Sequence, residues 1–215
     1  MKISILCSSK EHPIYPWLEV WIERIGMSHE VVLVEKGSDL TGGDILFLIS
    51  ANEIIRKDTL SKYRRGLVIH ASELPKGRGW SPHIWQILEG KNEIVVTLLE
   101  AAGKVDTGAI WSQKLLKLEG HELADEINAR LFDIEIGLMD YAVENFYEVK
   151  AKPQPDTEST TYRKRIPADS RFDPNKSIAE QFDLLRVADN KRFPAFIDFR
   201  GYRYEIKLEK KGKSI

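Results

Sequence analysis

Residues 44–70 read DILFLISANEIIRKDTLSKYRRGLVIH, and this stretch decides the fold class. It opens on an apolar run, Asp44 to Ile49, which is entered through the turn residues Thr41-Gly42-Gly43. A polar segment suited to a surface helix follows over Glu53 to Arg65, and Gly66 to His70 are apolar again. Short continuous apolar runs are typical of strands buried on both faces of a parallel sheet. The stretch therefore predicts a strand–helix–strand unit.

The same alternation extends to both sides of this unit. Further apolar runs predict strands at Lys2 to Cys7, Glu30 to Val34, Glu93 to Leu99 and Ala109 to Leu116. Segments with apolar residues three or four positions apart predict helices at Trp17 to Ile25, His83 to Leu88 and His121 to Glu148. Strands that alternate with helices indicate an α/β fold with a mainly parallel sheet.

The chain changes character near residue 150. Lys150 to Asp156, which contain two prolines, look like a linker. We therefore expect one domain over residues 1–150 and a short α+β extension over residues 151–215. A helix is predicted at Ser177 to Ala188, and Ala195 to Leu208 predict a hairpin with one buried face, because polar and apolar residues alternate over Tyr202 to Leu208.

Composition excludes several classes of protein. The 215 residues carry 32 Lys and Arg against 33 Asp and Glu, so the charge balance gives no nucleic-acid or membrane-surface footprint. The single cysteine, Cys7, allows no internal disulfide, and the five histidines show no metal-ligand spacing. Glycine-rich phosphate or dinucleotide motifs are absent. We expect a cytoplasmic protein without a metal, a membrane segment or a nucleic-acid partner.

The candidate site lies where the predicted strands end, because ligands of α/β sheets bind at the carboxyl ends of strands. His70 ends one strand, and Asp106 lies in the polar loop after another. A carboxylate beside an imidazole fixes the tautomer and stabilises the protonated ring, as a general acid/base near neutral pH requires. The alternative interpretation is that His70 is a structural residue at a strand end.

Two separated motifs carry a resemblance to a known family. Residues 70–82, HASELPKGRGWSP, resemble the His-x-Ser-x-Leu-Pro and Arg-Gly-x-x-Pro signature of the folate-dependent formyltransferases. Residues 96–100 and 105–110, VTLLE and VDTGAI, are similar to that family's Val-Thr strand and Asp-Thr-Gly loop, without gaps between the motifs. The resemblance is close over about residues 44–115. It implies a Rossmann-like formyltransferase core over residues 1–150.

The resemblance implies transfer of a formyl group from N10-formyltetrahydrofolate to a primary amine. His70 would be the general acid/base, and Asp106 would position it and stabilise its charged form. The matching segments would contact the folate through Asn52, Glu53, Ile54, Trp80, Ala102, Gly103, Lys104, Val105 and Asp106.

One position departs from the family pattern. The family places an asparagine two residues before the histidine, where this chain has Val68. That asparagine donates a hydrogen bond to the developing oxyanion, and losing one such donor costs about 2.7–4 kcal/mol in other acyl-transfer enzymes. Asn52, which also follows a strand, is a candidate replacement; alternatively it is the N-cap of the helix predicted after it.

The acceptor that the resemblance favours is a nucleotide-linked amino sugar. The neutral charge and the short C-terminal region are not typical of a tRNA-modifying enzyme. By resemblance, the substrate would be bound by Ser72, Lys76, Arg78, Tyr162, Arg163 and Arg165. Alternatively, these basic clusters are only solvated charges on loops. Two alternative functions also remain: the acceptor is an aminoacyl-tRNA or a carrier-bound aminoacyl group, or the protein binds folate or a sugar nucleotide without catalysis. The resemblance is also compatible with a homodimer.

Overall fold

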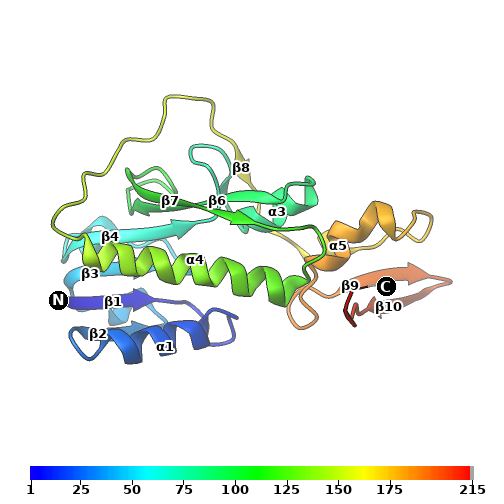
Figure 1. Cartoon of the computed structure of the whole chain (residues 1–215), viewed down its shortest axis with the longest axis horizontal. Helices are drawn as coiled ribbons and strands as arrows, with labels where there is room; N and C mark the ends of the chain where they lie inside the picture. Colours follow the sequence, from blue (N-terminus) through cyan, green and yellow to red (C-terminus); the bar gives the residue numbers. More distant parts are fainter. Residues whose placement is uncertain (214–215) are drawn as a thin grey trace.

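A six-stranded sheet forms the centre of the molecule in the computed structural model, which describes residues 1–213 (Figure 1). The strand order is β2-β1-β3-β4-β6-β7, and β1 to β4 run parallel whereas β6 and β7 are antiparallel to their neighbours. The strands are β1 Lys2–Leu6, β2 Glu30–Val34, β3 Gly43–Leu48, β4 Tyr63–His70, β6 Glu93–Glu100 and β7 Ile110–Lys117. The predicted α/β fold with a mainly parallel, Rossmann-like sheet is confirmed.

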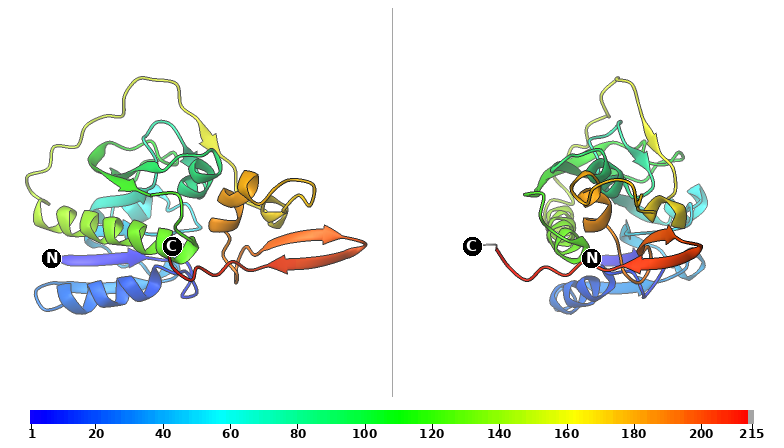
Figure 2. Two further views of the ribbon diagram at one scale, coloured as in Figure 1. Left: turned by 45° about the vertical axis from the view of Figure 1, so that its right-hand side comes forward. Right: turned by 90° about the vertical axis from the view of Figure 1, so that its right-hand side faces the viewer.

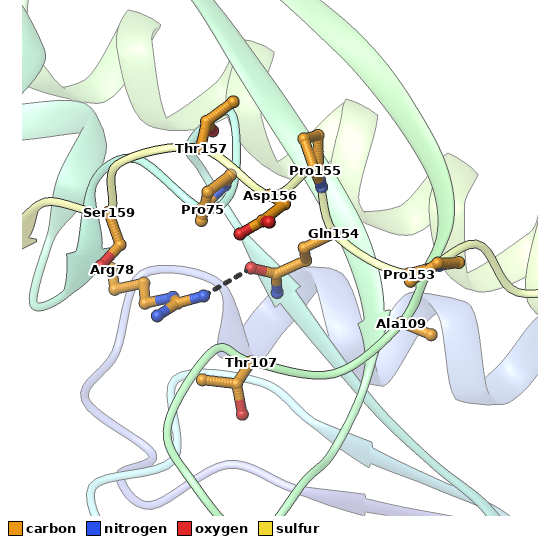
Figure 3. A pocket seen from close by; sticks show the side chains of 10 residues that line it. All are labelled: Pro75, Arg78, Thr107, Ala109, Pro153, Gln154, Pro155, Asp156, Thr157 and Ser159. Atoms are coloured by element: carbon orange, nitrogen blue, oxygen red, sulfur yellow. Dashed lines mark hydrogen bonds between the residues drawn. The ribbon is translucent and has the colours of Figure 1, made fainter.

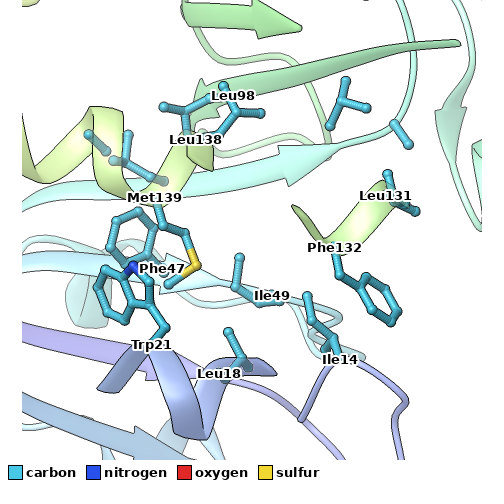
Figure 4. Close-up of a cluster of buried hydrophobic side chains, with 14 of the residues drawn as sticks. Ile14, Leu18, Trp21, Phe47, Ile49, Leu98, Leu131, Phe132, Leu138 and Met139 are labelled. Carbon is cyan, nitrogen blue, oxygen red and sulfur yellow. The ribbon is translucent and has the colours of Figure 1, made fainter. Parts of the chain in front are cut away.

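Helices α1 (Tyr15–Ile25) and α4 (Ala124–Glu144) pack on one face of the sheet and enclose the main core (Figures 1 and 4). Trp21 of α1 is 1% exposed and meets Phe47 of β3 edge to face, with ring centroids 5.9 Å apart. Its indole N–H donates to Asp140 Oδ1 of α4 at 2.8 Å, so the polar atom of this buried ring is satisfied. The apolar stripe predicted on the long helix is confirmed by Ile127, Leu131, Leu138 and Ala142, all buried.

The helix predicted over Glu53 to Arg65 is wrong. The structure has only one helical turn there, α2 (Lys57–Leu60), and β4 already begins at Tyr63. Tyr63 pairs in register with Gly43 of β3, and its hydroxyl donates to Ser4 Oγ at 2.9 Å. Ile55 packs in a second, smaller core cluster on the sheet. Strand pairing and this packing outweigh the local helical propensity of the segment.

The C-terminal region adds small elements to the sheet domain. Strand β8 (Thr161–Tyr162) pairs with β5 (Arg78–Gly79), next to helix α3 (Pro82–Leu88). The predicted helix over Ser177 to Ala188 is shorter, comprising η3 (Ala179–Gln181) and α5 (Phe182–Arg186). The remaining short turns are η1 (Gly37–Asp39) and η2 (Pro167–Ser170). The expected boundary at residue 150 stays a prediction, and residues 214 and 215 of the expected extension lie outside the described residues.

The predicted hairpin is present as β9 (Ala195–Phe199) and β10 (Tyr202–Ile206), and it projects from the body of the molecule (Figure 2). The expected buried face of its second strand is wrong, because Tyr202 is 70% and Tyr204 52% exposed. Within β10, Ile206 packs against the small cluster of Phe172, Leu185 and Ala195, whereas both tyrosines are exposed. The alternation in the sequence therefore has a core to face only at the end of the strand. A homodimer stays a prediction.

Within residues 1–213, no helix has the combination of length and apolar composition needed to cross a bilayer.

Candidate active site

His70 and Asp106 meet at the carboxyl end of β4. His70 is the last residue of that strand, and Asp106 lies in the loop between β6 and β7. The His70 Nδ1 atom is 3.6 Å from Asp106 Oδ2, and the two side chains are only 7% and 6% exposed. The structure therefore brings the two residues together, just beyond hydrogen-bond distance, at a site nearly closed to water.

The second nitrogen of His70 determines which atom of the ring exchanges a proton. Nε2 lies 2.8 Å from the carbonyl oxygen of Gly77. A carbonyl oxygen can only accept a hydrogen bond, so Nε2 carries a hydrogen and donates it. Nδ1, which faces Asp106, is then the nitrogen that gains or loses a proton. A protonated Nδ1 is stabilised by the carboxylate beside it.

Asp106 is held in place by its own loop and by β5. Its backbone has φ +54°, a left-handed conformation that is uncommon outside glycine. Its Oδ2 accepts a hydrogen bond from the Gly79 N–H at 2.9 Å. Two residues further on, a Cβ at Gly108 would lie 1.7 Å from the Glu100 carbonyl oxygen, so only glycine fits there. The loop is thus pinned against the end of β6.

The residues expected to contact a folate, apart from Asp106, whose side chain is buried, lie in exposed loops after β3, β5 and β6. Ala102 to Val105 are exposed, and Trp80 is 39% exposed with Lys164 Nζ 4.7 Å from its ring centroid. Asn52, Glu53 and Ile54 are exposed after β3. The N-cap interpretation of Asn52 is wrong, because helix α2 begins at Lys57 with Arg56 as its cap.

Val68, at the position of the missing asparagine, is half-buried on β4 between its register partners Leu48 and Leu99. Its hydrocarbon side chain has no donor. Residues Ser50 to Asn52 leave β3 at the same end of the sheet, because Leu48 and Val68 are direct partners in neighbouring parallel strands. The Asn52 backbone N–H donates to Ser8 Oγ at 2.9 Å, which fixes the start of this loop beside β1.

The residues expected to bind the acceptor fall into two groups. Tyr162 and Arg163 are engaged with the protein: the Tyr162 hydroxyl donates to Glu89 Oε2 at 2.9 Å, and Arg163 pairs with Asp169 through two hydrogen bonds. Burial, followed by the Glu89 carboxylate, raises the pKa of Tyr162 to about 12. These two side chains form a scaffold around the Trp85 ring, stacked on Tyr162 and 4.8 Å from the Arg163 guanidinium.

The second group keeps unused polar atoms. Arg165 is 7% exposed, donates to Ser170 Oγ at 3.1 Å, and has a buried Nε without a partner among the described residues. The Nε of Arg78 and the Oγ of Ser72 are likewise buried without a hydrogen-bond partner in residues 1–213. Lys76 is exposed.

Two further histidines approach the same end of the sheet and were not singled out from the sequence. His12 Nδ1 accepts the Ile14 N–H at 3.3 Å, so its Nε2 donates to Ser50 Oγ at 3.1 Å. Burial, with a smaller contribution from Arg192, lowers the pKa of His12 to about 4. Burial also lowers the pKa of His83 to about 3, assisted by His12. Both rings are therefore neutral near pH 7, and no group of three metal-binding side chains occurs in residues 1–213.

The linker-like segment after residue 150 contributes to the site, which sequence reasoning missed. Gln154 donates from Nε2 to the carbonyl oxygens of Asp106 and Gly108 at 2.8 and 3.0 Å, and its Oε1 accepts from Arg78 Nη2 at 2.8 Å. Gln154 and Arg78 line a cavity of about 460 Å³ on this side of the molecule (Figure 3). Nothing in the periodicity of the segment indicates these contacts.

Comparison with known proteins agrees with this geometry. The sequence profile of the formyl transferase family matches residues 33–143, which is more than half of the chain. The chain therefore belongs to the formyl transferase family. This part contains His70, Asp106 and all strands from β3 to β7.

The chain is 35% identical over 112 residues to a methionyl-tRNA formyltransferase from Prochlorococcus marinus, covering 52% of this chain and 33% of that protein. It spans between 22% and 53% of the length of four curated relatives that it matches.

Similar structures extend over the whole chain. A methionyl-tRNA formyltransferase from Clostridium thermocellum has a TM-score of 0.82 at 22% identity, covering 99% of this chain and 96% of that one. A sugar N-formyltransferase from Shewanella sp. has a TM-score of 0.72 at 16% identity, covering 100% and 99%. HypX from Aquifex aeolicus, in complex with tetrahydrofolic acid, has a TM-score of 0.75 at 20% identity, covering 100% and 39%. At these identities the likeness shows a shared fold.

Proposed function

We propose that this protein transfers a formyl group from N10-formyltetrahydrofolate to the primary amine of a nucleotide-linked amino sugar. The observation that carries the proposal is the buried His70–Asp106 pair, with Nδ1 and Oδ2 3.6 Å apart, in a chain of the formyl transferase family. In this pair His70 accepts a proton, and the negative charge of Asp106 stabilises the protonated ring. Acyl transfer to an amine requires such a proton acceptor.

The reaction has two steps, attack by the amine and departure of tetrahydrofolate, and one proton moves in each. The amine nitrogen attacks the formyl carbon, a C–N bond forms, and His70 Nδ1 takes the proton that the attacking nitrogen loses. The bond from the formyl carbon to N10 then breaks, and His70 returns the proton to N10 of the leaving tetrahydrofolate. Asp106 stabilises the imidazolium between these two steps, while the Gly77 carbonyl holds the other ring nitrogen.

The exposed loops suit a flat, amide-like donor molecule. The backbone of Ala102 to Val105 is exposed and irregular, so its N–H and C=O groups are available to a pteridine. The Trp80 ring, which is partly exposed, offers an apolar surface against which the pteridine could pack. HypX, which shares the fold, is known with tetrahydrofolic acid bound.

The sugar acceptor is supported by charge and by buried cationic atoms. The formal net charge of −1 does not favour a polyanionic tRNA. Arg78 and Arg165, each with a buried Nε free of partners in the described chain, are suited to the oxygen atoms of a diphosphate. We further propose that Asn52 replaces the oxyanion donor absent at Val68.

A formyl-transfer assay with N10-formyltetrahydrofolate tests the proposal. The acceptors are amino sugars carrying UDP, dTDP or GDP, with an aminoacyl-tRNA as the competing class. We expect transfer to at least one nucleotide sugar and its loss in His70→Ala, with thermal unfolding of the variant recorded as a control. Wild-type turnover in His70→Ala would refute the role of this residue, and transfer only to the tRNA would refute the sugar acceptor.

A further inference from the structure

Residues 152–162, which we call the strap, cross from the start of β7 to β5 (Figure 1). Lys152 exchanges two backbone hydrogen bonds with Ile110, at 2.6 and 2.8 Å. At the other end, Thr160 Oγ1 accepts the Gly77 N–H at 2.8 Å, and its carbonyl accepts the Arg78 N–H at 2.9 Å. The strap is therefore anchored to the two loops that hold the His70–Asp106 pair.

Gln154 is the one residue of the strap between its anchors that turns inward. All residues from Lys152 to Thr161 are exposed except Gln154, which is half-buried. Its side-chain amide makes three hydrogen bonds, at 2.8, 3.0 and 2.8 Å, to Asp106, Gly108 and Arg78. Figure 3 shows the amide directed toward the Arg78 guanidinium.

The chemistry of these partners requires an amide at this position. The carbonyl oxygens of Asp106 and Gly108 only accept hydrogen bonds, and the guanidinium of Arg78 only donates. One group must therefore present two N–H donors on one side and an oxygen acceptor on the other. Glutamine does so. Glutamate has the same shape, but its carboxylate oxygen would face the two carbonyl oxygens without a hydrogen to donate.

These bonds join the two sides of the catalytic pair. Arg78 lies between Gly77, whose carbonyl accepts from His70, and Gly79, whose N–H donates to the Asp106 carboxylate. Gln154 thus links the backbone that carries Asp106 to the segment that orients both members of the pair. A shift of this loop would move the Asp106 carboxylate relative to His70 Nδ1.

We propose that Gln154 is a positioning residue that holds the Asp106 carboxylate against His70 during formyl transfer. The proposal rests on the formyl transfer activity proposed above. Gln154 acts through Asp106 and takes no proton itself. The alternative role, anchoring of the strap alone, would affect stability without affecting the proton chemistry of His70.

Two substitutions and one matched control separate these roles. Gln154→Ala removes all three hydrogen bonds, and Gln154→Glu keeps the acceptor for Arg78 but loses both donors. Glu158→Ala is the control, because Glu158 is exposed in the same strap and makes no side-chain hydrogen bond or ion pair to the described residues. We expect kcat to fall by about 10–100-fold in both Gln154 variants, as misplacement of a catalytic group by about 1 Å does.

The pH dependence gives a readout that anchoring alone would not change. We expect the pH–rate profile of Gln154→Ala to differ from that of wild type, because displacing the Asp106 carboxylate changes the charge beside His70 Nδ1. The Glu158→Ala control should retain the wild-type kcat and profile. Unchanged kcat and pH profile in Gln154→Ala, or a fall in rate explained by the unfolded fraction, would overturn the proposal.

A measurement without turnover distinguishes failure of this proposal from failure of the proposed function. The 15N resonances of His70, assigned by their loss in His70→Gln, report the surroundings of its ring nitrogens in the free protein. We expect these resonances to shift in Gln154→Ala, because the Asp106 carboxylate 3.6 Å from Nδ1 is displaced, and to stay in place in Glu158→Ala. Identical His70 resonances in wild type and Gln154→Ala would overturn the positioning role, whatever the acceptor of the formyl group is.

Discussion

Replacement of Asp106 with asparagine isolates the charge of the proposed catalytic pair. Asparagine has the same shape, and its side-chain oxygen can still accept the Gly79 N–H that lies 2.9 Å from Asp106 Oδ2. The loop should therefore keep its conformation. What changes is the negative charge 3.6 Å from His70 Nδ1.

The size of the effect follows from this distance and from burial. Both side chains are less than a tenth exposed, so solvent screens the pair poorly. At an effective dielectric constant of about 20, two unit charges at this separation attract by about 4–5 kcal/mol. This attraction stabilises the imidazolium formed when His70 takes the proton of the amine. Its loss should lower kcat by about 10³-fold, since about 1.4 kcal/mol corresponds to a factor of ten.

Steady-state release of tetrahydrofolate measures this change, with the acceptor identified in the formyl-transfer assay. Thermal unfolding of Asp106→Asn serves as the control and should lie within a few degrees of wild type. A folded Asp106→Asn variant with kcat within about tenfold of wild type would refute the reasoning, because the charge would then contribute little to the transition state.

Two further predictions concern stability. Arg186 is 1% exposed beside the fully buried Glu122. Arg186→Met leaves that carboxylate with Arg130 as its remaining ion-pair partner, besides the backbone N–H groups of Glu119 and Gly120. We expect urea unfolding to show a loss of about 3 kcal/mol, and a loss below about 1 kcal/mol would contradict this. Burial raises the pKa of Glu135 to about 8. The contribution of the neutral Glu135 to the free energy of unfolding is therefore complete below the unfolded-state pKa near 4.5 and is lost as the pH rises toward 8. Glu135→Gln should remove this loss and unfold at a higher temperature than wild type at pH 8 but not at pH 4; parallel melting curves across this range would contradict it.

Much of the fold could be predicted from local patterns. The strands from Lys2 and Glu93 are largely buried runs of β-branched and apolar residues, the strand from Glu30 is a β-branched run at the edge of the sheet, and the stripe on α4 repeats with the helical period. Both signals reflect burial against a sheet, so they survive in the sequence. The helix predicted over Glu53 to Arg65 fails because Tyr63 pairs with β3, a partner that lies outside the segment.

The site was predictable only in part. His70 ends β4 at the carboxyl edge that β4 shares with its parallel neighbour β3. Asp106 follows β6, but β6 runs antiparallel to β4 and its last residue, Glu100, pairs with Leu67, so the loop after β6 has to fold back to bring Asp106 to His70. The hairpin shows the limit of pattern reasoning: the alternation over Tyr202 to Leu208 predicts a buried face, but within β10 only Ile206 packs into a hydrophobic cluster, and Tyr202 and Tyr204 are exposed. Burial is a property of the neighbours, which the alternation does not specify.

By itself, the sequence determined the strand and helix alternation of the sheet domain and placed His70 at its carboxyl edge, because burial period and strand ends are local properties. Only the tertiary structure decided that the strap closes on the Asp106 loop. Gln154 meets Asp106 across 48 positions and Arg78 across 76, through single hydrogen bonds. Such long-range polar contacts recur with no period, so they depend on how the whole chain packs.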